Sequence, residues 1–74
     1  MARHLRFSVK GMSCPSTGIA VEKALCRVPG VVRAAVNYLT NTVYVDYHPE
    51  MVDLSPIHIV LQQFGLTVGE VSPG

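Results

Sequence analysis

The residue best suited to chemistry is Cys14, in the stretch GMSCPSTGIAVEKAL that runs from Gly11 to Leu25. A cysteine at the start of a helix faces unpaired backbone N–H groups and the positive end of the helix dipole, which favour the thiolate. We therefore expect a lowered pKa for Cys14. Thiolate is the form that binds soft metal ions and attacks disulfides. A second thiol three places on would complete a chelating pair, but that residue is Thr17.

The other thiol and the imidazoles do not supply the missing ligand. If residues 15–27 form a helix, Cys14 and Cys26 lie roughly 18 Å apart at about 1.5 Å per residue. A disulfide needs Cα atoms within about 7 Å, so the pair can neither bridge nor share one ion. Free thiols fit a reducing cytosol, and we expect Cys26 to be buried or half-buried. The histidines lack metal-site spacing relative to Cys14 and are not expected to be ligands: His4, His48 and His58.

Length and composition bound the class of protein. The chain has 74 residues, 49% apolar and 15% charged, which predicts one small globular domain over residues 1–74. No apolar run approaches the roughly 20 residues that span a bilayer, and the N-terminus lacks the pattern of a secretory signal. We expect a cytoplasmic domain with no direct membrane insertion. The net charge of +1 argues against binding to nucleic acid.

The elements that position Cys14 follow from the apolar pattern. Alternation predicts a strand over residues 3–10, with Leu5, Phe7 and Val9 on one face. Pro15 opens a helix, and Pro29-Gly30 ends it. The predicted apolar stripe of this helix consists of Ile19, Val21, Ala24, Leu25 and Val28. Next come a strand over residues 31–38, a turn, and a strand over residues 42–47. The inward sets are Val32, Ala34, Val36 and Tyr38 in the first, and Val43, Val45 and Tyr47 in the second.

A second helix and a last strand complete the pattern. Asp53 or Ser55 caps the helix, and Gly65 ends it. Its stripe is Ile57, Val60, Leu61 and Phe64. Ile59 lies off that stripe, which suggests an apolar surface for another domain or a second copy. A short strand over residues 66–71 is expected at a sheet edge. The order βαββαβ predicts an α+β, ferredoxin-like fold: a four-stranded antiparallel sheet with two helices on one face.

Five segments carry a resemblance to a known family: GMSCPST, VEKAL, VPGV, VNYLTNTVYVDYHPE and QQFGL, in that order. The sequence resembles the heavy-metal-associated domain, found as free copper chaperones and as N-terminal modules of metal-transporting P-type ATPases. The family motif is Gly-Met-(Thr/Ser)-Cys-x-x-Cys. The resemblance implies that Cys14 is the first metal ligand and that Thr17 replaces the second. It also implies a supporting role for the loop residues Met12 and Ser13, and for Leu66, where relatives often carry Tyr or Lys.

The resemblance implies binding and transfer of Cu(I), with Zn(II), Cd(II) or Hg(II) as alternatives, and no catalysis by the domain itself. The implied partners are a copper chaperone or domains of a metal-transporting ATPase. Because a threonine hydroxyl is a hard, neutral oxygen, we expect it to be a poor Cu(I) ligand. Three sources would then complete the site: Cys14 of a second copy in a metal-bridged homodimer, the cysteines of a partner, or a nearby side chain of this chain, for which the sequence offers no clear candidate.

Two other functions stay open at this point. The first is a metal-free regulatory or interaction domain of such an ATPase, which keeps the fold and docks to its neighbours. The second is a monothiol oxidoreductase, in which a lone low-pKa thiol forms a mixed disulfide. Against the second stands the order of elements, which differs from the thioredoxin-like order.

Overall fold

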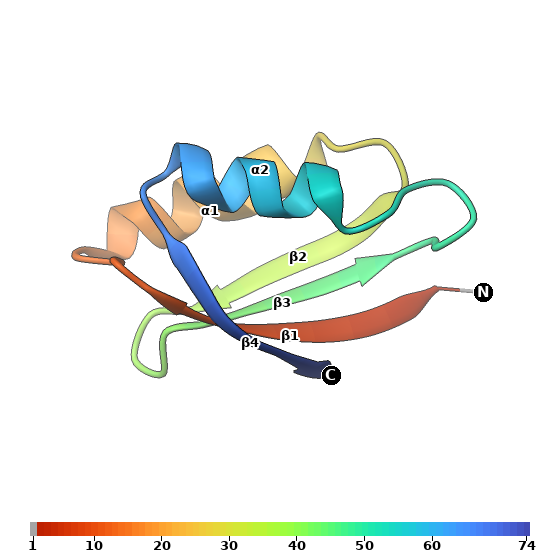
Figure 1. Ribbon diagram of the computed structural model, residues 1–74. Helices are drawn as coiled ribbons and strands as arrows, with labels where there is room; N and C mark the ends of the chain where they lie inside the picture. Colours follow the sequence, from red (N-terminus) through yellow and green to blue (C-terminus); the bar gives the residue numbers. More distant parts are fainter. Residues whose placement is uncertain (1) are drawn as a thin grey trace.

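The computed structural model describes residues 2–74. The elements follow in the order β1 (Arg3–Lys10), α1 (Pro15–Cys26), β2 (Val31–Asn37), β3 (Thr42–Tyr47), α2 (Ser55–Gln63) and β4 (Thr67–Pro73). Within the described residues the strands form one antiparallel sheet in the order β2-β3-β1-β4. Both helices cover the same face of it (Figure 1). This arrangement confirms the predicted ferredoxin-like fold. Neither helix has the length and apolar content that crossing a bilayer requires.

The helix starts depend on residues just outside each helix. Cys14 occupies the cap position of α1 in an extended conformation, with φ −152° and ψ 155°, and Pro15 follows in the first turn. Proline suits this place because its missing N–H would have no helical partner. The cap position of α2 is Leu54, so the prediction of Asp53 or Ser55 as the cap is wrong. The Asp53 carboxylate nevertheless accepts the Ser55 N–H at 2.9 Å, which satisfies one free donor.

The core lies between the sheet and the helices. Alternation predicted the inward faces of the two central strands correctly, because β1 and β3 have helices on one side and water on the other. The fully buried side chains of the core are Phe7, Val21, Leu25, Val43, Val45, Ile57 and Leu61. Val60 and Phe64 pack against this core, whereas Ile59 is 52% exposed, as predicted.

The edge strand β2 departs from the predicted alternation. Its register with β3 shifts between Val31 and Arg33. This irregularity turns Val31 toward the core and leaves Val32 55% exposed, so the prediction that Val32 faces inward is wrong. Tyr38 lies beyond the end of the strand and is exposed, which corrects its placement on the inward face. A bulge of this kind adds one residue to one strand, and the period of two then changes phase.

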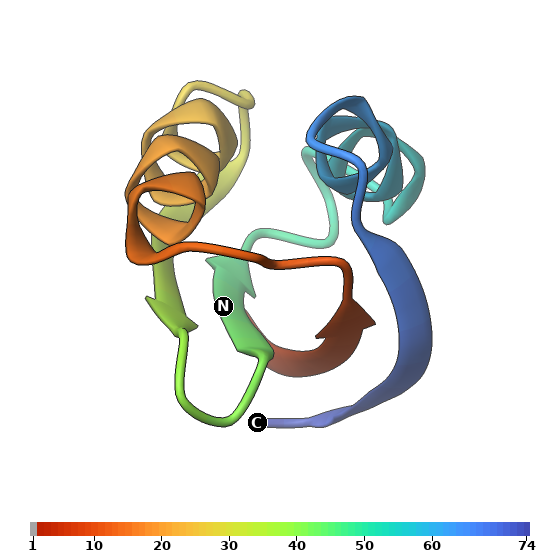
Figure 2. The same cartoon turned by 90° about the vertical axis from the view of Figure 1, so that its left-hand side faces the viewer.

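Helix α1 also meets the sheet differently from its predicted stripe. Its buried residues are Gly18, Val21 and Leu25, and Ile19 is 56% exposed. A Cβ atom on Gly18 would lie 3.0 Å from a methyl carbon of Val36, so the helix approaches β2 where only hydrogen fits. The close approach turns Ile19 outward. Figure 2 shows α1 above β2, on the side of the sheet away from β4.

The last strand and the second cysteine both differ in part from what the sequence predicts. β4 lies at a sheet edge as predicted, but it spans Thr67–Pro73 rather than residues 66–71. Leu66 precedes the strand and is 2% exposed. The Gly74 N–H donates to the His4 carbonyl at 2.9 Å, which extends the pairing with β1 to the end of the chain. Cys26 is exposed, so its predicted burial is wrong.

Candidate functional site

Cys14 lies where the loop after β1 enters α1, and its thiol is surrounded by hydroxyl groups. The Cys14 Sγ atom is 3.1 Å from Ser16 Oγ and 3.3 Å from Thr17 Oγ1. The Thr17 N–H donates to the Cys14 carbonyl at 3.1 Å, which closes the first turn. The side chain is half-buried, whereas Ser13, Pro15 and Ser16 around it are exposed. The sulfur is therefore held by its own helix turn and remains open to an approaching molecule.

The prediction of a lowered pKa is confirmed, but its leading cause differs. The pKa of Cys14 is lowered from an ordinary value of 9.0 to about 7, mainly by the hydroxyl of Ser16 and then by that of Thr17. The backbone N–H groups of the same two residues also lower it, and partial burial opposes them. Hydrogen bonds to the charged form favour that form. Sequence reasoning missed Ser16; its signal is a hydroxyl two places after a cysteine at the helix cap.

The loop rests on the turn that follows α2. Gly11 has φ +104°, and a Cβ atom there would lie 2.7 Å from the carbonyl oxygen of Gly65 and 3.8 Å from the Cα atom of Leu66. Met12 is 9% exposed, and its sulfur lies 3.6 Å from the Cβ position of Gly18. The structure therefore places Leu66 against the loop and Met12 in the core beneath α1. Ser13 is exposed, and its supporting role stays a prediction.

The other potential ligands make no contact with Cys14 among the interactions found in residues 2–74, and the histidines have contacts of their own. Cys26, a free thiol, ends α1, twelve residues along the chain from Cys14. His4 pairs with Asp46 at 2.6 Å across β1 and β3. The His58 ring lies 5.6 Å from that of Phe7, and His48 Nδ1 is 3.4 Å from Glu50 Oε1. Residues 2–74 contain no group of three or more His, Cys, Asp or Glu side chains that could hold a metal ion.

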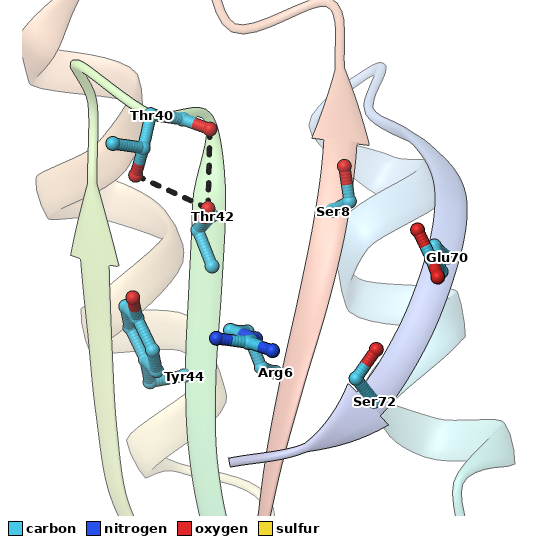
Figure 3. Close-up of a pocket in the computed structure, with 7 residues that line it drawn as sticks. All are labelled: Arg6, Ser8, Thr40, Thr42, Tyr44, Glu70 and Ser72. Atoms are coloured by element: carbon cyan, nitrogen blue, oxygen red, sulfur yellow. Dashed lines mark hydrogen bonds between the residues drawn. The ribbon is translucent and has the colours of Figure 1, made fainter.

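A hollow of about 390 Å³ lies on the face of the sheet opposite the helices (Figure 3). Arg6 on β1 lies there between its cross-strand neighbours Tyr44 and Ser72. The main lining groups are the side chains of Arg6, Ser8, Thr42, Tyr44, Glu70 and Ser72. These groups offer no sulfur or imidazole to a soft ion, and antiparallel sheets often leave one polar face to water. The Cys14 loop therefore remains the candidate site.

This site offers one soft sulfur ligand and two hard hydroxyl oxygens. A soft ion such as Cu(I) prefers sulfur, so the loop can hold one side of its coordination sphere. The pKa of about 7 makes a substantial fraction of Cys14 available as thiolate at neutral pH. The other free thiol among residues 2–74, Cys26, lies at the opposite end of α1.

Comparisons with known proteins show the family to which most of the chain is similar. The heavy-metal-associated domain family matches residues 6–66. A copper-exporting P-type ATPase of Bacillus subtilis is 32% identical over 59 residues, which cover 80% of this chain and 7% of that protein. The chain thus spans less than a tenth of the length of this relative.

Solved structures agree in fold over most of the chain. The structure of the CopZ metallochaperone is 33% identical, with a TM-score of 0.83, and the match covers 89% of this chain and 98% of that one. The Cu(I)-loaded N-terminal domain of a potential copper-translocating P-type ATPase from Bacillus subtilis is 28% identical, with a TM-score of 0.85. That match covers 100% of this chain and 95% of the other.

Proposed function

Because the chain belongs to the heavy-metal-associated domain family, we propose that it is a cytoplasmic Cu(I)-binding and transfer domain that acts through Cys14. It serves either as a chaperone or as an N-terminal module of a copper-transporting P-type ATPase, and residues 1–74 form one domain that carries metal without catalysing a reaction. One observation supports this above all: the thiol in the family's loop has a pKa of about 7 and an open approach.

The chemistry of the loop favours Cu(I) among the soft ions. Structural Zn(II) sites take four ligands, and this loop offers one thiolate and two weakly donating hydroxyls. Thr17 Oγ1, 3.3 Å from the sulfur, occupies the place where the family motif has its second cysteine. Cys14 then contributes one of the two sulfurs that Cu(I) needs, and the other comes from a partner molecule.

Two sources of the second sulfur fit the site. A chaperone or ATPase domain with two cysteines can dock at the loop and share its ion with Cys14, so that transfer proceeds by exchange of sulfur ligands. Alternatively, Cys14 of a second copy completes a bridged homodimer. Ser13 and Ser16 are exposed on either side of Cys14, which leaves room for either approach.

Titration of the reduced protein with Cu(I) against a competing chelator tests the proposal, with the oligomeric state measured in parallel. We expect binding that Cys14→Ser abolishes and the matched control Cys26→Ser preserves. Half an ion per chain with dimerisation assigns the second sulfur to another copy. One ion per chain only in the presence of a two-cysteine partner domain assigns it to that partner. Equal binding by wild type and Cys14→Ser, or none by either with and without the partner, refutes the proposal.

The metal-free docking domain is the second candidate, and Thr17 is the observation that favours it, because its hydroxyl replaces a ligand. Partner binding that is unchanged by Cu(I) and by Cys14→Ser would support this candidate. The monothiol oxidoreductase loses its support, because the elements follow the ferredoxin-like order.

A further inference from the structure

The side chain of Glu22 joins α1 to the edge of the sheet. Its Oε2 atom accepts the backbone N–H of Val36 at 2.7 Å. β2 is an edge strand, so this N–H points away from β3 and has no neighbouring strand to receive it. A carboxylate acceptor makes a short, strong hydrogen bond to a backbone N–H. Glu22 is half-buried and forms no salt bridge within residues 2–74, so the hydrogen bond to Val36 is the polar interaction that holds its carboxylate there.

Val36 meets α1 a second time, one helical turn earlier. The position that a Cβ atom of Gly18 would take lies 3.0 Å from Val36 Cγ1 and 3.6 Å from the sulfur of Met12. Residues four apart lie on the same face of a helix. Gly18 and Glu22 therefore both contact Val36 of β2, from two successive turns of α1. The first contact limits how close the helix lies to the sheet. The second limits its rotation and its slide along the strand.

We propose that Glu22 is a positioning residue for Cys14: through its bond to Val36 it fixes the placement of α1, and with it the thiol at the start of that helix. The inference rests on the proposed function, since it concerns the same metal-binding loop. Glu22 is eight residues from Cys14, about 12 Å along the helix axis at 1.5 Å per residue.

A change at Glu22 reaches Cys14 because α1 is a rigid helix. α1 moves as a unit because its backbone is hydrogen-bonded throughout, and its N-terminal turn carries both Cys14 and the hydroxyls that contact it. Without the Glu22 bond, α1 is still held by the apolar packing of Gly18, Val21 and Leu25, but this packing is non-directional and allows a small rotation of the helix about Val36. A roll moves the thiol relative to the loop at Gly11, which is held separately by the turn after α2. Metal sites lose affinity when their supporting contacts are removed.

Three substitutions at Glu22 separate the effect of its hydrogen bond to Val36 from the effect of its negative charge. Glu22→Ala removes the acceptor, Glu22→Asp keeps the charge on a side chain one methylene shorter, and Glu22→Gln keeps an acceptor oxygen at full length. The matched control is Lys23→Ala, at the neighbouring exposed position of α1. Each variant is measured by Cu(I) competition with a chelator and by the amide NMR signals of Val36, Cys14 and residues 16–18 in the metal-free protein.

We expect Glu22→Ala and Glu22→Asp to weaken Cu(I) binding about tenfold, as loss of a supporting contact does elsewhere. Both should also shift the amide signals of Val36, Cys14 and residues 16–18. Glu22→Gln should restore affinity and signals, and Lys23→Ala should change neither. Unchanged signals at Cys14 and residues 16–18 in Glu22→Ala or Glu22→Asp overturn the inference, even if the variant is less stable, because a purely structural role would not reach the loop. Failure of Glu22→Gln to restore them overturns it as well.

The two readouts also distinguish this inference from the proposed function. If the wild-type protein binds no Cu(I) while the signals behave as expected, the metal function fails and the positioning of Cys14 by Glu22 stands. If Glu22→Ala does not fold, Glu22→Asp compared with Glu22→Gln gives the same decision, because both keep a polar side chain at that position.

Discussion

Replacing Thr17 by cysteine tests the reasoning about the site most directly. The Thr17 hydroxyl lies 3.3 Å from the Cys14 sulfur. Two sulfurs bound to one ion at about 2.3 Å each are about 3.8 Å apart at a tetrahedral angle and about 4.6 Å apart in a line. In Thr17→Cys the pair therefore has to open by only about 0.5–1.3 Å, relative to the present contact. Rotation of the two side chains can supply that movement.

The expected gain in affinity follows from the worth of one thiolate. Four-ligand zinc sites release about 10–16 kcal/mol on binding, or about 2.5–4 kcal/mol per ligand. Side-chain strain from opening the pair costs about 0.5–1.5 kcal/mol. The net gain is then about 2 kcal/mol, which is roughly a 30-fold increase in affinity. It should be accompanied by a change from bridged dimer or partner-dependent binding to one ion per monomer.

The assay is chelator competition with Cu(I) under reducing conditions, with Thr17→Val as the matched control. Valine keeps the branched shape and removes the hydroxyl, so it should not raise the affinity. A Thr17→Cys affinity within threefold of wild type, with both thiols reduced, refutes the view that Thr17 occupies the place of a ligand. An equal rise in Thr17→Val refutes it too, because the gain would then come from losing the hydroxyl.

Two further predictions concern the thiol and the loop that carries it. In a Cys26→Ser background, the rate of Cys14 alkylation should rise with pH around a midpoint of about 7, because thiolate is the reacting form. Ser16→Ala should move that midpoint upward, and a wild-type profile centred near the ordinary value of 9.0 would contradict the hydrogen bonding described. Gly11→Ala should lower the free energy of unfolding by about 1–3 kcal/mol in denaturant titrations, because φ is +104° and the new Cβ meets a carbonyl oxygen. Gly69→Ala, whose new Cβ comes no closer than 3.6 Å to another atom, is the control and should not lose stability, because losing glycine's freedom in the unfolded chain favours folding; an equal loss there would contradict strain and contact at Gly11 as the cause.

Local patterns predicted the fold well where an element has one solvent-exposed face and one buried face. Phe7 and Val9, and Val43 and Val45, were found on the buried faces of β1 and β3 because these central strands keep a regular period of two. The pattern failed at Val32, where an irregularity in the pairing changes the phase of an edge strand. Apolar periodicity carries no sign of such a shift.

The prediction of the buried face of α1 was partly wrong for a related reason. The predicted stripe began at Ile19, but the contact with β2 is made by Gly18, which has no side chain to mark it as apolar. Hydrophobic patterns count large side chains, whereas close packing also uses the absence of one. The same limit hid Ser16, whose hydroxyl contributes most to the lowered pKa of Cys14 and has no periodicity to reveal it.

The sequence by itself determined the βαββαβ order, the cysteine at the first cap and the missing second thiol, because these are properties of neighbouring residues. The tertiary structure decided what surrounds them. Gly65 and Leu66 lie against the loop at Gly11, more than fifty positions away along the chain. Glu22 reaches Val36 from another element. Local patterns state which face of an element is buried, but they do not name the atoms that meet it. That choice is made only when helices and strands pack at specific registers, and here it decides how one thiol is held.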